Sequence, residues 1–121
     1  MSYALVVDDN RQTADCLCQM LSFLGLQVTP SYGPRAAILA LKETTPSIIF
    51  LDLNLPGIDG FEIMAYLRRE PRFANVPVVV VTSDDQPETA IKARRTGALL
   101  VLVKPATIDS LERVLRTTKL I

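Results

Sequence analysis

The 121-residue chain contains no histidine. This absence excludes a Ser-His-Asp or Cys-His mechanism, a histidine metal site and a histidine proton switch. Any phosphohistidine chemistry must therefore bring its histidine from another molecule. The chain has two cysteines, Cys16 and Cys18, which stand two apart in an expected helix and so point to different sides. We expect no disulfide between them, and we expect at least one to pack as a small hydrophobic residue.

An excess of charge and a long apolar run are also missing. Thirteen basic residues balance thirteen acidic ones, so the chain lacks the basic footprint of a nucleic-acid-binding protein. The longest apolar runs have about six residues, too few to span a membrane. The N-terminus reaches Asp8 and Asp9 too early for a signal peptide. These features, together with free cysteines, predict a cytoplasmic protein without a membrane span.

The composition and patterning indicate one globular α/β domain over residues 1–121, because 49% of the residues are hydrophobic and 21% are charged. Five short apolar runs with little polar alternation are typical of parallel strands covered on both faces. They lie at 3–7, 26–29, 47–51, 76–81 and 99–103. We expect a doubly wound, five-stranded parallel sheet with five helices and the flavodoxin-like strand order 2-1-3-4-5.

Start and stop signals place the five helices between and after these strands. Gly25 is suited to close the first helix, and Pro34 fits the first turn of a second that ends before Pro46. Two pairs of residues have the spacing of a capping box, and Thr107 is suited to cap the fifth helix. The pairs are Asp59 with Glu62 for the third helix and Asp85 with Glu88 for the fourth, which Gly97 would close.

Polar side chains follow four of the five expected strands, where a doubly wound sheet binds its ligands. Each of them alone has an ordinary explanation as a helix cap or a solvated loop residue. Together they bring three carboxylates to one edge, and these repel one another unless a cation joins them. Mg²⁺ prefers such oxygen ligands, while a lysine and a threonine hydroxyl suit phosphoryl oxygens. The set predicts a phosphoryl-transfer site in which a carboxylate can be the nucleophile; it comprises Asp8, Asp9, Asp52, Thr82, Ser83 and Lys104.

Four motifs in order along the whole chain resemble the receiver domain of bacterial two-component response regulators. They are Asp8-Asp9-Asn10, the segment from Asp52 to Gly60, Thr82-Ser83, and Gly97-Ala98 leading to Lys104-Pro105. The resemblance implies a phospho-acceptor signalling switch rather than an independent turnover enzyme. Asp52 would take a phosphoryl group from a sensor histidine kinase or a histidine phosphotransfer protein.

The resemblance also implies roles for the other site residues. Asp9, Asp52 and the backbone carbonyl of Asn54 would coordinate Mg²⁺, and Asp8 would assist through water. The Thr82 hydroxyl, the Ser83 amide and the Lys104 ammonium would contact the phosphoryl group, and the Lys104–Pro105 bond would be cis. Pro56, Gly57 and Gly60 would have a backbone role in the loop after Asp52.

Two departures from the family pattern lie near the fifth strand. Val101 stands where receivers usually carry a Tyr or Phe whose ring swings inward when the threonine moves toward the phosphate. Leu99 and Leu100 occupy positions that are commonly polar or acidic. We expect either that this run is wholly buried or that Leu99 or Val101 forms an exposed apolar patch. Such a patch, on the fourth-helix, fifth-strand and fifth-helix face, would bind an output partner or a second copy of the chain.

Two other functions remain open on the sequence alone. A binding module with the same fold would leave Asp52 unphosphorylated, and Val101 is compatible with this alternative. A small phosphatase with Asp52 as nucleophile would need a second acid or base, and Asn54 holds the obvious position for it. Flavin or dinucleotide binding is disfavoured, because no glycine-rich loop follows the first strand.

Overall fold

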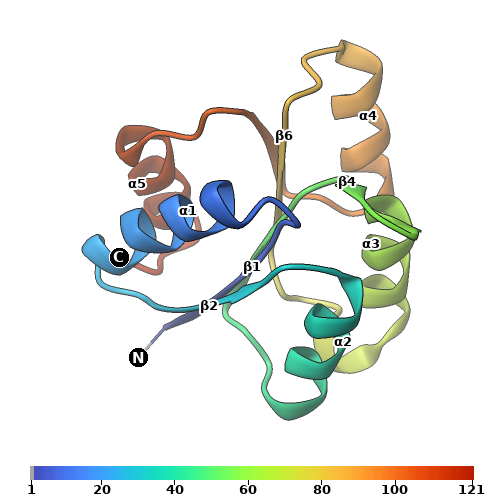
Figure 1. The fold of residues 1–121 in the computed structure, drawn as a ribbon, viewed down its shortest axis with the longest axis horizontal. Helices are drawn as coiled ribbons and strands as arrows, with labels where there is room; N and C mark the ends of the chain where they lie inside the picture. The colour runs from blue at the N-terminus through green and yellow to red at the C-terminus, as the bar shows by residue number, and fades with distance from the viewer. Residues whose placement is uncertain (1) are drawn as a thin grey trace.

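A computed structural model describes residues 2–121 as a parallel sheet covered by helices on both faces (Figure 1). The strand order is β2-β1-β3-β6-β7, which is the predicted order 2-1-3-4-5 once two short extra strands are counted. The sheet strands are β1 (Tyr3–Val7), β2 (Gln27–Ser31), β3 (Ile48–Leu51), β6 (Val78–Thr82) and β7 (Leu100–Val103). The helices are α1 (Arg11–Phe23), α2 (Pro34–Glu43), α3 (Gly60–Arg69), α4 (Pro87–Thr96) and α5 (Ile108–Thr117), with a 3-10 turn η1 (Pro71–Phe73).

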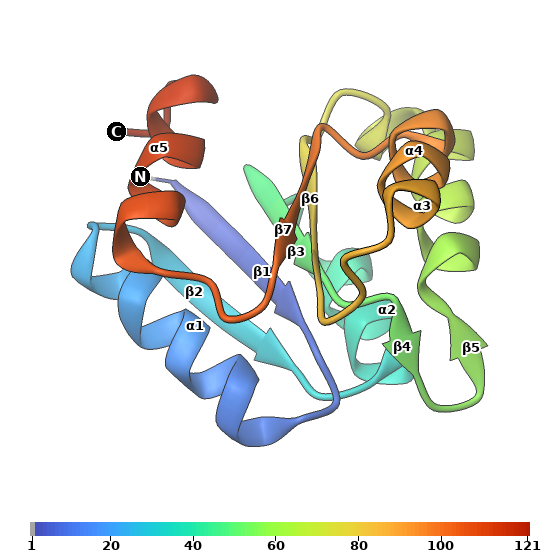
Figure 2. The same cartoon turned by 90° about the horizontal axis from the view of Figure 1, so that it is seen from above.

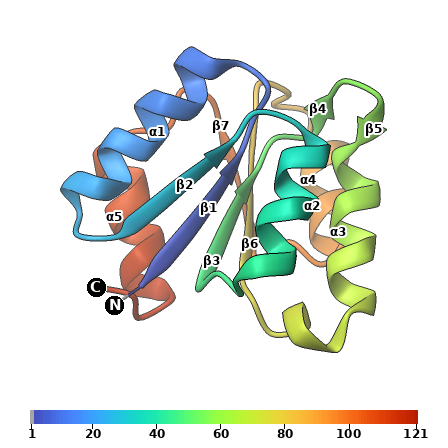
Figure 3. The same ribbon diagram turned by 60° about the horizontal axis from the view of Figure 1, so that its bottom comes forward.

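Alternate residues of the central strands enter two separate cores, which explains why their sequences show no polar alternation. Helices α1 and α5 cover one face, and α2, α3 and α4 cover the other (Figures 2 and 3). The core under α1 and α5 receives Ala4, Val6, Ile48, Phe50, Val79 and Val81. The core under α2, α3 and α4 receives Leu5, Val7, Ile49, Leu51, Val78 and Val80.

Several strand limits differ from those predicted. Strand β2 runs on to Ser31 through Pro30, which an edge strand tolerates because its outer side needs no N–H donor. Strand β6 begins at Val78 rather than Val76, because the carbonyl of Val76 accepts from Arg68 and Pro77 has no N–H. Two-residue strands β4 (Asn54–Leu55) and β5 (Ile58–Asp59) form a small hairpin that we did not predict.

The predicted helix caps are confirmed at two helices and wrong at a third. Asp59 accepts from the N–H of Phe61 at the start of α3, although its predicted capping box with Glu62 does not form, and Thr107 caps α5 in a capping box with Ser110. Asp85 does not cap α4, which begins one residue later than predicted. Its first residue is Pro87, whose fixed φ suits the first helical position.

All five helices begin at the carboxyl edge of the sheet, because each runs back against parallel strands (Figure 3). Acidic residues stand in the first turns of three helices, where they complement the helix dipole; they are Glu62, Glu88 and Asp109. Basic residues stand in the last turns of four, namely Lys42, Arg68, Arg69, Arg94, Arg95 and Arg116. The fold therefore separates charge along its axis.

Both cysteines lie on α1. Cys16 is exposed, whereas Cys18 is half-buried against the core, and both are free. Burial, followed by the charge of Asp15, raises the pKa of the Cys18 thiol to about 11, so it stays protonated. Within residues 2–121, no helix is both long and apolar enough to cross a membrane.

Candidate functional site

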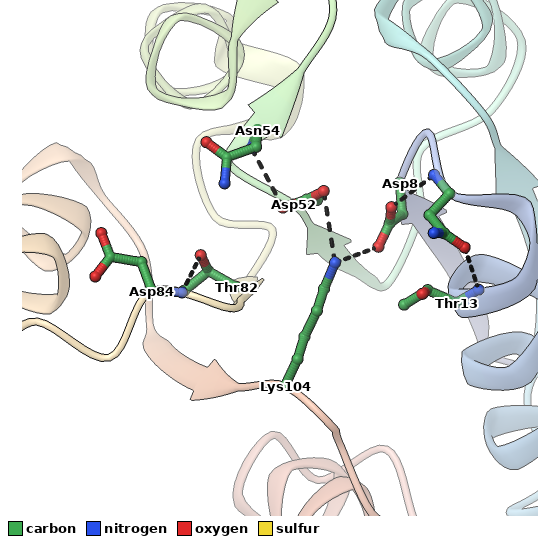
Figure 4. Close-up of polar contacts among 8 residues, drawn as sticks. Asp8, Thr13, Asp52, Asn54, Thr82, Asp84 and Lys104 are labelled. Carbon is green, nitrogen blue, oxygen red and sulfur yellow. Dashed lines mark hydrogen bonds and ion pairs between the residues drawn. The ribbon is translucent and has the colours of Figure 1, made fainter.

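The carboxyl edge of the sheet brings Lys104 between two buried carboxylates (Figure 4). Its Nζ lies 2.9 Å from Asp8 Oδ2 and 3.6 Å from Asp52 Oδ2. Asp8 follows β1, Asp52 follows β3 and Lys104 follows β7, so three strands position one cluster. The peptide bond between Lys104 and Pro105 is cis, as the resemblance implied.

Three carboxylates meet at this edge, as predicted. Asp8 is 3% exposed and Asp52 is 6% exposed, whereas Asp9 is open to solvent. One carboxylate oxygen from each residue lies within 4.8 Å of the others. Hard oxygen ligands at this spacing, one of them exposed, are suited to a divalent cation that keeps part of its water shell.

Backbone amides hold the two buried acids in place. Asp8 Oδ1 accepts from the N–H of Asn10 at 2.9 Å, and Asp52 Oδ1 accepts from the N–H of Asn54 at 3.2 Å. Asn10 in turn caps α1 by accepting from the N–H of Thr13. The acids are thus oriented by the turns that leave β1 and β3, and each keeps an oxygen toward Lys104.

Burial dominates the electrostatics of Asp52. It raises the pKa of this carboxyl above its ordinary value, and the charges of Asp8 and Asp9 act in the same direction. The Asn54 amide and the Lys104 ammonium oppose the shift without cancelling it. Burial would lower the pKa of Lys104, but its bonds to Asp8 and Asp52 outweigh that effect and raise it. Lys104 is therefore charged at neutral pH.

The loop after Asp52 requires glycine at two points. Gly57 has φ of +81°, in the left-handed region that side chains rarely adopt. A Cβ on Gly60 would lie 2.6 Å from the Cα of Leu53 and 2.8 Å from the carbonyl oxygen of Asp52. The first residue of α3 therefore packs directly against the backbone that carries Asp52.

Thr82 and its loop complete the edge. Thr82 is fully buried at the end of β6, and its Oγ1 accepts from the N–H of Asp84 at 3.1 Å. Ser83, whose amide is also predicted to contact the phosphoryl group, is exposed beside it. Sequence reasoning missed Asp84, whose carboxylate accepts from the N–H of Gln86 and the hydroxyl of Thr89. An acid three residues before a proline at a helix start is the signal that could have found it.

The run around β7 is partly exposed, so the expectation that it is wholly buried is wrong. Leu99 and Val103 are each 46% exposed. Val101 is half-buried and packs against the core under α2, α3 and α4. Ile91 of α4 and Ile108 of α5 are exposed large apolar residues on the flanking helices. Leu99, rather than Val101, is therefore the exposed residue of the two that we considered.

Comparison with known proteins agrees with this geometry. A family model described as the response regulator receiver domain matches residues 4–116. The C4-dicarboxylate transport transcriptional regulatory protein DctD of Pseudomonas aeruginosa is 31% identical over 97% of this chain, but the match covers only 26% of DctD. This chain thus corresponds to about a quarter of the length of that relative.

Solved structures share the whole fold. The chemotaxis response regulator CheY4 of Vibrio cholerae superposes with a TM-score of 0.90, at 25% identity over 98% of each chain. A response regulator protein from Burkholderia pseudomallei has a TM-score of 0.86 at 27% identity, covering 97% of this chain and 68% of that one. The structure of the Burkholderia protein contains a phosphorylated aspartic acid, a calcium ion and citrate.

Proposed function

We propose, given that this chain belongs to the response regulator receiver domain family, that it is a phospho-acceptor switch with Asp52 as its acceptor. The observation that carries the proposal is the Lys104 ammonium between the buried carboxylates of Asp8 and Asp52. A fixed cation at this position neutralises charge that phosphoryl transfer brings to the edge. The phosphorylated aspartic acid in the Burkholderia relative supports the same chemistry.

The reaction needs a phosphohistidine on another molecule, because this chain has no histidine. An Asp52 carboxylate oxygen attacks phosphorus as the phosphorus–nitrogen bond breaks, and the bond's electron pair stays on the imidazole. The product is an acyl phosphate on Asp52. Lys104 and the Thr82 hydroxyl contact the phosphoryl oxygens, and the Ser83 amide assists. The donor is a sensor histidine kinase or a histidine phosphotransfer protein of a cytoplasmic phosphorelay.

The acidic cluster suits Mg²⁺, since all its ligands are hard oxygens. Asp9 and Asp52 would hold the ion with the Asn54 carbonyl, and Asp8 would assist through water. When bound, Mg²⁺ supplies charge neutralisation at the phosphoryl oxygens. Within this chain, the same residues assist both the gain and the loss of the phosphoryl group, without making it an independent turnover enzyme.

Intact mass after incubation with acetyl phosphate tests the acceptor. We expect a labile phosphoryl adduct that depends on Mg²⁺ and disappears in Asp52→Asn, which keeps the shape of the side chain and removes the nucleophile. Asp85→Asn is the matched control, because Asp85 is exposed and lies outside the cluster; it should retain the adduct.

The other outcomes point to other functions. An undiminished adduct on Asp52→Asn would show that the acceptor is another residue. A wild-type chain that never forms an adduct would favour a binding module. Rapid consumption of acetyl phosphate without an adduct would favour a phosphatase.

A further inference from the structure

Helix α4 is held firmly at its C-terminal end. Within residues 2–121, the guanidinium of Arg68 donates to four backbone carbonyls, and one of these, at 3.0 Å, is the carbonyl of Gly97 directly after α4. The other three belong to the turn that leads into β6, so Arg68 connects the end of α4 to α3 and to that turn. Among the described residues of α4 itself, Ala93 is the one that is buried. Besides Ala93, the Lys92 ammonium of α4 lies over the Phe61 ring of α3, 4.2 Å from its centroid.

The N-terminal end of α4 is held by a single carboxylate outside the helix. Gln86, the capping residue, makes no hydrogen bond with its own side chain. Asp84 Oδ1 accepts instead from the N–H of Gln86 at 2.9 Å, and Asp84 Oδ2 accepts from the Thr89 hydroxyl at 2.6 Å. Both bonds favour the ionised form of Asp84 and lower the pKa of this carboxyl, the bond from Thr89 having the larger effect.

The same residue is bonded to the phosphoryl site through its backbone. The N–H of Asp84 donates to Oγ1 of Thr82 at 3.1 Å, while its carboxylate points away from Asp52 and Lys104 (Figure 4). Strand β6 lies beside β3 and runs parallel to it, so Thr82, at the end of β6, lies at the same edge of the sheet as Asp52. Three hydrogen bonds thus connect the Thr82 hydroxyl to the first turn of α4.

We infer that Asp84 is a positioning residue that holds the first turn of α4 to Thr82 and releases it when Thr82 binds a phosphoryl group. The inference rests on the proposed function of Asp52. A phosphoryl group on Asp52 offers strong acceptors to the Thr82 hydroxyl. Turning toward them draws Thr82 Oγ1 away from the Asp84 N–H, and the loop that carries the Asp84 carboxylate shifts away from Thr89.

This route explains how α4 can respond without an aromatic ring at position 101. Val101 is half-buried and too small to change place as a ring does. The C-terminal end of α4 is fixed at Gly97, whereas its first turn is held through Asp84. The first turn is therefore the part of α4 that can move when the bonds to Asp84 break. Ile91, which is 51% exposed, lies one residue beyond that turn and would be displaced with it.

Amide hydrogen exchange followed by NMR tests the tether in the unmodified chain. Thr89→Val keeps the shape of the side chain and removes the hydroxyl donor to Asp84. We expect amides 88–91 to exchange about fivefold faster than in the wild type, as loss of one hydrogen bond predicts. Thr96→Val is the matched control, because the Thr96 hydroxyl bonds within α4 to the carbonyl of Lys92 and does not touch the loop.

Two substitutions of Asp84 distinguish the loss of these hydrogen bonds from a general change in packing. Asp84→Asn keeps an acceptor for Gln86 and a partner for the Thr89 hydroxyl, so we expect near wild-type exchange. Asp84→Ala removes both and should resemble Thr89→Val. Equal exchange in Thr89→Val and Thr96→Val, or in Asp84→Asn and Asp84→Ala, would overturn the inference.

The phosphoryl mimic beryllofluoride then tests release. In the wild type it should accelerate exchange at 88–91, whereas in Thr89→Val, already released, it should add little. A response confined to the amides next to Asp52 would overturn the inference and leave the proposed function standing. No response anywhere in the wild type would count against the proposed function, and with it the coupling.

Discussion

At the scale of single residues, the unusual group is Asp52, because its surroundings favour the neutral form of its carboxyl. Burial raises its pKa in the folded chain above the ordinary value of 3.8. At a pH between the ordinary pKa of 3.8, which holds in the unfolded chain, and the raised pKa of the folded chain, the folded state binds more protons than the unfolded one. The free energy of unfolding therefore falls as pH rises through this window, and the loss is complete above the folded pKa.

Asp52→Asn removes this loss. We expect the variant to melt a few degrees above the wild type at pH 7. The difference should shrink as the pH is lowered toward 3.8, where the wild-type carboxyl becomes protonated. Thermal unfolding followed by circular dichroism across this pH range measures it. A difference that does not vary with pH would mean that packing, rather than charge, separates the two proteins.

At the scale of elements, the start of α3 and the loop after β3 are built as one unit, because Gly60 leaves no room for a side chain against Leu53. We expect Gly60→Ala to lower the free energy of unfolding by about 1–3 kcal/mol, as overpacking does. It should also slow adduct formation, since the clash displaces the backbone of Asp52.

Chemical denaturation of Gly60→Ala and of a matched variant checks this prediction. Gly33→Ala is the control, because Gly33 has extended backbone and a Cβ there would meet nothing within 4 Å. Loss of the glycine cap costs about 1 kcal/mol, and the lower backbone entropy of alanine in the unfolded chain offsets about 0.4–1 kcal/mol of this, so the net loss should be well below that of Gly60→Ala. Equal losses in the two variants would show that α3 can shift freely away from the Asp52 loop.

The elements also show where sequence reasoning succeeds. The strands and their order were predictable because their apolar runs are short, continuous and separated by capped helices. The β4–β5 hairpin was not, since two-residue strands leave no periodic pattern. Asp84 and Asp85 are adjacent acids, and the capping-box spacing to Glu88 favoured Asp85 as the residue that holds the start of α4, whereas Asp84 does so in the structure. Only the fold shows that Pro87 starts the helix and leaves Asp84 in place to hold it.

The residues of the site could be predicted from the sequence, but their burial and relative positions could not. Polar residues after parallel strands meet at one edge, so the cluster of acids and lysine followed from their positions. Which acids are buried did not follow, because Asp8 and Asp9 are neighbours of the same type. Nor did the position of Lys104, which depends on how β7 ends relative to β1 and β3.

At the scale of the whole molecule, the α4, β7 and α5 face is proposed to bind a second copy or an output partner through Leu99. Sedimentation of the wild type and Leu99→Asp, each with and without beryllofluoride, tests this. We expect association by the wild type that the mimic changes and that Leu99→Asp abolishes, because a charge would have to be buried at the contact.

The control for that experiment is Leu39→Asp, because Leu39 is also an exposed leucine and lies on α2, far from this face in the fold. It should sediment as the wild type does. Four monomeric samples, together with a pull-down that finds no partner sensitive to Leu99, would show that Leu99 serves packing alone.

Because all five helices run in one direction, their charged side chains give this electrically neutral chain a dipole moment that opposes the helix dipoles. Acidic first turns and the Asp8, Asp9 and Asp52 cluster face one way, and basic last turns face the other. The proposed phosphohistidine partner, if it carries cations around its histidine, would be oriented toward Asp52 before contact, and salt should slow that encounter although the net charge is zero. The proposed phosphorylation of Asp52 would add about two negative charges to this already acidic end of the molecule. The modified protein would thus differ from the unmodified one in its long-range electrostatic field, as well as in its contact surface.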